Sequence, residues 1–467
     1  MIMEVIGIIL SLFLLMFFAY RGYSVILFAP IFALLAASLS GLSVMPAYTE
    51  LFMAKGVTYI KSFFPVFLLG AVFGKVMEET GLAKGIAQYI IKSLGQERAI
   101  LAVVLAGAVL TYGGVSLFVV VFAVYPFASA LFREANIPKR LLPGTIALGA
   151  FTATMDCLPG TPQIQNLIPT NFFGTNIYAA PTLGIISGFA IFSLGIMWLE
   201  RRRKAAKEAG EGYGNHTLNE PEIRHDVDLP SWQIAILPLL TVLVVNFAMI
   251  RFFNWDPNLL APFVAMKLPL IAASIKNVIS IWALIIALLC GIILAVALGF
   301  KRLPAGGLAK TLNAGALGSL LAIMNTASEV GYGNVIASLP GFKAISAALM
   351  GIKVGGSPLV SEAITVNVLA GITGSASGGM SIALDLMAKD WLAWANAIGM
   401  SPDILHRVAS MASGGMDTLP HNGAVITLLA VCGLTHRDSY GDIFVMTIIK
   451  TAMVFVAITI HSLTGLL

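Results

Sequence analysis

The sequence contains little charge, and this scarcity limits the class of protein. Only 11% of the 467 residues are Asp, Glu, Lys or Arg, whereas 58% are hydrophobic, and the mean hydropathy is +0.90. A soluble domain carries about 25% charged residues, so this chain lacks the polar residues that cover a soluble enzyme. The apolar content also excludes intrinsic disorder. The composition therefore indicates a polytopic membrane protein.

Cysteine and catalytic motifs are equally scarce. Cys157, Cys290 and Cys432 lie in apolar surroundings without CxxC or His-paired spacing, so we expect free thiols with no disulfide and no metal. No GxSxG, HExxH, Walker or GxGxxG pattern occurs in a suitable context, which argues against an enzyme and against a bound cofactor. The net charge of +5 does not indicate nucleic acid, because the dense basic cluster at 201–204 follows an apolar run, as at a cytoplasmic membrane edge.

Long apolar runs are what the sequence has in abundance. They are about 20 residues long, the length of a transmembrane helix, rather than the ~10 alternating residues of a barrel strand. We therefore expect an all-α protein embedded in a lipid bilayer. The predicted spans are 4–20, 23–40, 62–78, 98–133, 140–170, 177–199, 231–250, 258–275, 278–299, 308–327, 354–398, 402–434 and 443–465. The shorter segments 45–61 and 82–96 contain Lys and are predicted to be interfacial or connecting helices.

Four of these runs are interrupted, and the interruptions repeat. Gly-Gly-x-Ser occurs at 113–116 and at 378–381, and Met-Asp-x-Leu-Pro follows it at 155–159 and at 416–420. The same order and similar spacing indicate duplicated halves. Proline breaks a helix, and unwound backbone at membrane depth is tolerated only within protein or beside a water-filled cavity.

The distribution of Lys and Arg orients the two halves. If 201–204 is cytoplasmic, the positive-inside rule is satisfied when 98–133 is a hairpin that enters and leaves by one face. The second hairpin, 354–398, must then enter from outside, which makes the halves an inverted repeat, as in secondary transporters. The expected division is a first repeat at 1–199 (scaffold 1–61, transport part 62–199), a flexible cytoplasmic linker at 200–230, and a second repeat at 231–467 (scaffold 231–299, transport part 308–467).

The interruptions contain no Lys or Arg, but each is followed by the predicted start of a helix, near Ser116 and Ser381 after the two glycine pairs. A helix N-terminus offers free N–H groups and a partial positive charge, and glycine lets an anion approach the backbone. Several such ends near the midplane would bind a small organic anion without a buried cation. The alternatives are that Gly and Pro only kink helices for packing, and that Ser and Thr only bond the backbone. The predicted substrate-binding residues are Gly113, Gly114, Ser116, Thr154, Gly160, Thr161, Gln163, Gly378, Gly379, Ser381, Thr418, His421 and Asn422.

Acidic residues within the interruptions are candidate proton-coupling groups. An aspartate inside a membrane is costly and by default functional, although Asp156 and Asp417 also stand where a helix cap would. His421 titrates nearest to neutral pH, and Glu362 lies in the middle of an apolar run. The predicted coupling residues are therefore Asp417, His421, Asp156 and Glu362. Residues Glu78, Glu79 and Glu329 lie near span ends and are predicted to be interfacial.

These motifs resemble those of a known family. Residues 417–423 after Gly414-Gly415, together with 156–162, look like the paired motifs of the gluconate:proton symporter (GntP) family of the ion-transporter superfamily, and the resemblance extends along nearly the whole chain. Residues 413–428 are similar to its D-β-hydroxybutyrate permease branch. The chain departs from the gluconate branch, which has Phe-Phe-Glu in the first hairpin and a first break rich in His and Pro. The resemblance implies proton coupling and an elevator-like motion of the hairpin domain.

The function expected from these observations is secondary active symport. The protein should take up a short hydroxy-monocarboxylate, 3-hydroxybutyrate above all, with protons across the cytoplasmic (inner) membrane of a prokaryote, as a homodimer. Three alternatives stay open: a proton symporter for gluconate or another sugar acid, a sodium-coupled carboxylate carrier, and a channel for small anions.

Overall fold

The computed structural model describes residues 2–21, 23–220, 229–268, 270, 272, 274–275, 278–304, 306–352, 354–420 and 422–467. Regular secondary structure in these residues is entirely helical. Six helices of the described chain are long and apolar enough to cross a membrane, or seven with one bent pair. The six are Val44–Glu79, Pro181–Glu208, Trp232–Arg251, Ile279–Arg302, Gly307–Ser338 and His436–Thr464. The expectation of an all-α, multi-pass membrane protein is confirmed.

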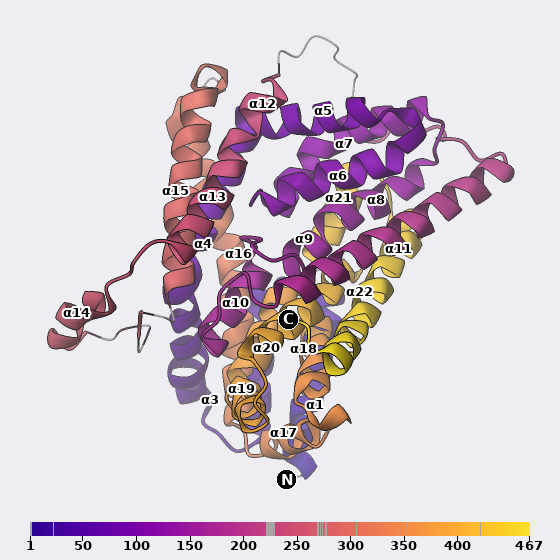
Figure 1. The fold of residues 1–467 in the computed structure, drawn as a ribbon. Helices are drawn as coiled ribbons and strands as arrows, with labels where there is room; N and C mark the ends of the chain where they lie inside the picture. The colour runs from indigo at the N-terminus through magenta and orange to yellow at the C-terminus, as the bar shows by residue number, and fades with distance from the viewer. Residues whose placement is uncertain are drawn as a thin grey trace.

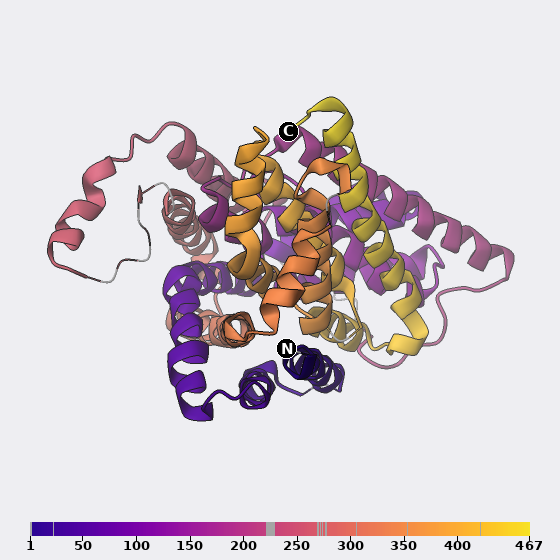
Figure 2. The same ribbon diagram turned by 90° about the horizontal axis from the view of Figure 1, so that it is seen from below.

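One bundle of helices forms a side of the molecule (Figures 1 and 2). It consists of α1 (Ile2–Tyr20), α2 (Val25–Leu39), α4 (Ala54–Glu79), α13 (Leu237–Arg251), α15 (Ile279–Gly299) and α16 (Gly307–Ser338). Helix α16 packs along α4 and α2, and α15 packs against α4 and α13. Small residues allow the close approach, since a Cβ at Gly315 would lie 2.7 Å from the Cα of Val72. The segments 62–79 and 308–338, expected to belong with the hairpins, lie in this bundle, which we call the scaffold bundle.

Two helical hairpins lie in opposite halves of the molecule in Figure 1. In the first, α6 (Ala99–Tyr112) and α7 (Leu117–Glu134) are joined by residues 113–116, and α5 (Leu82–Leu94) bends away from the segment Gln96–Tyr112 by 104°. In the second, α18 (Leu359–Thr373) and α19 (Ala376–Ala397) are joined at Gly374 and Ser375. The predicted hairpins thus correspond to helix pairs that pack against each other.

The second hairpin turns earlier than predicted. We expected α19 to begin near Ser381, after Gly378-Gly379, but it begins at Ala376, so that prediction is wrong. Gly374 adopts the left-handed conformation that ends α18, with φ of 68°, and the Ser375 side chain accepts a hydrogen bond from the Gly378 N–H. A serine N-cap therefore decides where the helix starts. The glycine pair lies in the first turn of α19, where it serves close packing.

Replacing Gly379 with Ala is expected to destabilise the second hairpin. A Cβ at this position would overlap backbone atoms of Ala370 on α18, which cannot move without parting the two helices. Overpacking of this kind costs about 1–3 kcal/mol or more. Thermal unfolding of the purified protein measures the loss. Gly70→Ala on α4 is the matched control, because no atom lies within 4 Å of its added Cβ, and equal stability of the two variants would contradict the prediction.

Both predicted proline breaks are present in the structure. The first broken span consists of α8 (Leu142–Ala150), α9 (Ala153–Asp156) and α10 (Ile164–Phe173), and we call residues 154–166, which include the start of α10, the first break. The second consists of α20 (Pro402–Gly414), η8 (Gly415–Thr418) and α21 (Gly423–Cys432), with a second break at 413–424 that includes the end of α20 and the start of α21. Helices α11 (Pro181–Glu208) and α22 (His436–Thr464) run alongside them. Prediction and structure agree here because proline acts locally.

The predicted span at 258–275 is wrong for its described residues. These form only η4 (Pro257–Leu260) and α14 (Ala261–Ala265), which project from the molecule on an arm (Figures 1 and 2). Proline at the second position starts α14, and Lys267 takes a positive φ of 57° just after it. A residue in this conformation cannot continue a helix, so the apolar composition alone was misleading.

Part of the predicted linker is helical or contacts neighbouring helices. Helix α11 continues to Glu208, and residues 209–220, which we call the strap, contact α7 and α21. Tyr213 is only 7% exposed and bonds Ser129 at 2.8 Å, while Asn219 donates to the Ala430 carbonyl at 2.8 Å. Residues 221–228 lie outside the described residues. The described strap therefore makes specific contacts, and the assignment of 200–230 as a cytoplasmic linker stays a prediction.

Replacing Glu220 with Gln is expected to loosen the strap. Glu220 pairs with the buried Lys139 at 2.6 Å and also contacts Arg133 and Tyr213. Burial raises the pKa of Glu220, but its hydrogen bond and attraction to Lys139 outweigh burial, so the pKa lies below its ordinary 4.5. A depressed pKa means that the stabilisation is present above 4.5 and is lost as the pH falls through the folded-state value.

Hydrogen exchange of residues 209–220 at neutral and acidic pH measures this effect. We expect the wild-type strap to be protected at neutral pH and the Glu220→Gln strap to exchange faster, because the variant leaves Lys139 buried without a counter-charge. The two proteins should converge in acid. Equal protection at neutral pH would show that the ion pair does not hold the strap.

Candidate substrate and coupling site

The first break contacts the turn of the first hairpin. The amide of Gln163 donates to the carbonyls of Thr111 at 2.8 Å and Val115 at 3.4 Å. Pro162 lies against Gly114, where a Cβ would approach its ring carbon to 3.1 Å, and Gly114 has a φ of 92° that other residues rarely adopt. The break thus supplies the partners that the helix end lacks.

The second break contacts the turn of the second hairpin in a similar way. The amide of Asn422 donates to the Gly374 carbonyl at 3.0 Å, and its oxygen caps α21 by accepting from the Ala424 N–H at 2.7 Å. An amide side chain from each break therefore holds the turn of the hairpin in the same half of the chain.

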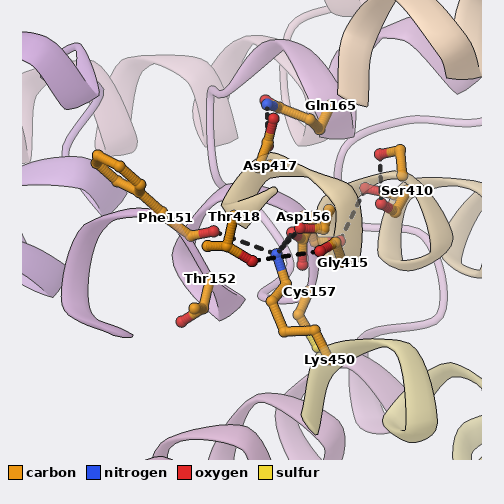
Figure 3. A network of polar contacts seen from close by, with 12 residues as sticks. Phe151, Thr152, Asp156, Cys157, Gln165, Ser410, Gly415, Asp417, Thr418 and Lys450 are labelled. Carbon is orange, nitrogen blue, oxygen red and sulfur yellow. Dashed lines mark hydrogen bonds and ion pairs between the residues drawn. The ribbon is translucent and has the colours of Figure 1, made fainter. Parts of the chain in front are cut away.

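Asp417 joins the two breaks. Its carboxylate is 7% exposed and accepts from Gln165 of α10 at 2.9 Å and, at 3.4 Å, from Asn422. The backbone N–H of Ala376, at the start of α19, provides a further hydrogen bond. Figure 3 shows Gln165 and Asp417 facing each other across the two halves of the chain. A carboxylate at this place is stabilised by the N-terminal end of α19.

A buried lysine connects the same two breaks from a third element. The ammonium of Lys450, in the middle of α22, lies 2.5 Å from Asp156 and donates to the carbonyls of Phe151 and Gly414 (Figure 3). Lys450 and Asp156 are 1% and 0% exposed. We expected the breaks to lack a buried cation, and this expectation is wrong because the cation comes from the neighbouring helix.

Arg407 on α20 is a second buried cation. Its guanidinium is fully buried and donates to the carbonyls of Asp156 and Ala179 and to the side chain of Asn166. The adjacent His406 bonds Thr175 and Asn166. These contacts satisfy the unwound backbone of the first break, as buried polar groups require.

The other predicted binding residues fall into two groups. Most of the hydroxyls already bond within the protein: Thr154 to Gly149, Thr161 to Thr154, Ser381 to Ser377 and Thr418 to Thr447. The remaining positions shape the backbone: Gly113, Gly160, Gly378 and Gly379 lie at close approaches, and Ser116 stands before α7. His421 lies outside the described residues, so its pairing with Asp417 stays a prediction.

Two further glutamates are buried, one of them a predicted coupling residue and the other predicted to be interfacial. Glu362 is fully buried on α18 without a recorded partner for either carboxyl oxygen, but about 18 Å of helix separates it from Gly374, at 1.5 Å per residue. Glu329, predicted to be interfacial, is 2% exposed in the interior of α16 and lies against Gly378. That prediction is wrong because α16 extends to Ser338, well past the predicted end of its span.

Sequence reasoning missed Lys450, Arg407, Gln165 and Glu329. The first two carry a usable signal, since each is a single basic residue within an apolar span, and such residues are rare and functional in membranes. Gln165 and Glu329 carry no such signal, because only the fold brings α10 and α16 to the start of α19.

Broken helices that meet hairpin turns around buried polar groups, within a multi-pass helical protein, are typical of secondary transporters. Comparison with known proteins agrees: the chain belongs to the GntP family of permeases, whose model matches residues 1–351. It is 54% identical, over 99% of its length and the full length of the relative, to YxjC, an uncharacterized transporter of Bacillus subtilis (strain 168). It is also 27% identical to an uncharacterized permease of Haemophilus influenzae over 60% of each chain. The protein is therefore a transporter and not an enzyme.

Solved structures share the fold. The YdaH transporter of Alcanivorax borkumensis, described as having an unusual topology, matches 87% of this chain and 86% of its own with a TM-score of 0.53 at 18% identity. MtrF of Neisseria gonorrhoeae, described as illuminating a class of antimetabolite efflux pumps, matches 90% of this chain and 84% of its own with a TM-score of 0.53 at 14% identity. At these identities the likeness concerns the fold alone.

Proposed function

We propose that the protein is a proton symporter that takes up a short hydroxy-monocarboxylate, with 3-hydroxybutyrate as its substrate. The observation that carries this proposal is the position of Asp417, a nearly buried carboxylate at the start of α19 that is bonded by amides from both breaks. An anion bound at the same helix start favours protonation of Asp417, and protonation of Asp417 favours the anion. That reciprocal linkage is what symport requires.

The surroundings of this helix start suit a hydroxy acid. The amide oxygen of Gln165 is buried without a hydrogen-bond partner and can accept a hydrogen bond from a hydroxyl group. The N-terminal end of α19 provides a favourable field for a carboxylate. The resemblance of 413–428 to the D-β-hydroxybutyrate permease branch supports the same substrate class.

Transport by an elevator motion fits the packing. In this proposal the hairpins α6–α7 and α18–α19 move together with the two broken spans, α11 and α22. The scaffold bundle, which includes α4 and α16, stays fixed and forms the dimer interface. This division modifies the expected one, in which 62–79 and 308–338 moved. The two halves form an inverted repeat in the cytoplasmic membrane of a bacterium, with α5 and α7 on the cytoplasmic side.

A substrate screen on the purified protein tests the proposal. A ligand that binds only the folded protein raises its thermal stability, so 3-hydroxybutyrate should stabilise it more than gluconate or other sugar acids. In proteoliposomes an inward pH gradient should drive accumulation without sodium. Stronger stabilisation by gluconate, or a requirement for sodium, would favour the corresponding alternative, and labelled substrate without a counterflow overshoot would indicate a channel.

A further inference from the structure

Glu329 places a second carboxylate at the start of α19. The residue belongs to α16 of the scaffold bundle and is 2% exposed. Its Oε2 lies so close to Gly378 that a Cβ at this position would overlap it, and the Ser375 hydroxyl lies 3.1 Å from the same point. The carboxylate therefore lies against the first turn of the helix whose start we assign to the substrate anion.

The Glu329 carboxylate has no counter-charge. Its Oε2 is buried without a hydrogen-bond partner, and the Ser375 hydroxyl provides a hydrogen bond to the carboxyl group. Within the described part of the chain no Lys or Arg forms an ion pair with it. The titratable group that faces it from α4 is Tyr59, whose buried hydroxyl lies beside the hydroxyls of Ser381 and Thr326. The favourable field at this place is that of the α19 N-terminus.

Three further charged residues lie near the start of α19. Asp417 of the second break reaches the start of α19 through the Ala376 N–H. On the other side, Lys55 of α4 pairs with Asp385 of α19 at 2.7 Å, two turns beyond Gly378. Two carboxylates thus share one helix start, and like charges in a dry site cannot both be ionised at low cost. A third carboxylate, that of the substrate, would meet the same repulsion.

We propose that Glu329 is an internal competitor of the substrate: ionised, it occupies the anion-accepting start of α19 in the empty transporter, and protonated, it yields that place to the substrate carboxylate. The proposal rests on the proposed function and names a regulatory device within the same site. Because Glu329 belongs to the scaffold bundle and α19 to the moving hairpin, the ionised residue also holds the two parts together. Its proton opens the site and is not carried across with the substrate.

The first test measures the affinity for labelled 3-hydroxybutyrate between about pH 5 and 8. Each proton linked to binding changes the affinity tenfold per pH unit in the range where it titrates. We expect Glu329→Gln to bind the substrate more tightly than wild type at the alkaline end of this range. Its binding should also be linked to the uptake of one proton fewer, so that its affinity depends less steeply on pH. The variant Glu329→Asp keeps the charge and should retain the wild-type slope, and Asp417→Asn with Glu329→Gln should bind independently of pH.

The matched control is Glu79→Gln, since Glu79 lies at the end of α4, pairs with Lys75 at 2.7 Å and is outside the site. It should bind as wild type does at every pH. An unchanged slope and affinity in Glu329→Gln, beside pH-dependent binding by the wild type, would overturn the inference and leave the proposed function standing.

A second test needs no ligand and separates the two proposals. Hydrogen exchange of residues 374–381 in the empty protein reports whether the first turn of α19 is held. Relative to Glu329→Gln at the same pH, the wild-type turn should be more protected at alkaline pH and equally protected in acid. If the protein binds no carboxylic acid but shows this difference in exchange, the substrate assignment is wrong and the contact of Glu329 with α19 is supported. If the two proteins have the same exchange profile at every pH, the contact is refuted.

Discussion

Replacing Asp417 with Asn is expected to abolish the accumulation of substrate under an imposed pH gradient while leaving exchange of labelled for unlabelled substrate intact. The substitution preserves the shape of the side chain and its contacts with Gln165 and Asn422, but removes the titration that couples proton and anion. With one proton carried per anion, one pH unit supplies about 1.4 kcal/mol, a tenfold accumulation. The variant should reach no accumulation at all.

Proteoliposomes with an acidic exterior provide the measurement. Asp390→Asn is the matched control, because Asp390 lies on the same helix, α19, but is exposed, and it should accumulate substrate as wild type does. If the Asp417→Asn protein still concentrates substrate, Asp417 acts only as a helix cap, and Glu362 becomes the next candidate for coupling.

Replacing Lys450 with Met is expected to cause the largest loss of stability. Lys450 pairs with Asp156 and donates hydrogen bonds to the carbonyls of Phe151 and Gly414. Its removal leaves the Asp156 charge buried without a counter-charge and removes the side chain that contacts both breaks. Breaking a buried pair by removing one member costs about 3–5 kcal/mol. Unfolding of the detergent-solubilised protein, followed by fluorescence, measures the effect.

The double variant Asp156→Asn with Lys450→Met tests whether the loss of stability comes from the unpaired Asp156 charge or from the other contacts of Lys450. It should recover much of the stability, because no uncompensated charge remains buried. Lys75→Met serves as the surface control, since Lys75 is 27% exposed and pairs with Glu78 and Glu79, and such pairs contribute about 1 kcal/mol or less. A Lys450→Met protein as stable as this control would show that the lysine does not join the breaks.

Local signals in the sequence predicted much of the fold. Proline at 159 and 420 acts on the turn that contains it, so both broken spans were predicted at the right place. Helix starts that depend on a single hydrogen bond were harder to predict from the sequence. Because Ser375 caps α19, this helix begins before its glycine pair and not after it. The segment 258–275 failed because hydropathy measures apolarity and not the ability to continue a helix.

The candidate site was predictable only in part. Asp417, Gln163 and Asn422 were found because they lie within the breaks. Lys450, Arg407 and Glu329 were not assigned to the site, since they come from α22, α20 and α16, and nothing local in the sequence tells which helix face meets which break. Contacts between distant segments decide such sites, and a single sequence carries little information about them.

The buried charges of the part that we propose to move have an electrical consequence. The buried cations Arg407, Lys450 and Lys139 and the buried anions Asp156, Asp417 and Asp442 sum to zero when the transporter is empty. They sum to zero again when Asp417 carries a proton and the substrate brings one negative charge, provided that Glu362 stays neutral. A membrane voltage of 100 mV does about 2.3 kcal/mol of work on a single unbalanced charge. Both strokes of the cycle would therefore be insensitive to voltage, and the carrier would run at the same rate in polarised and in depolarised cells.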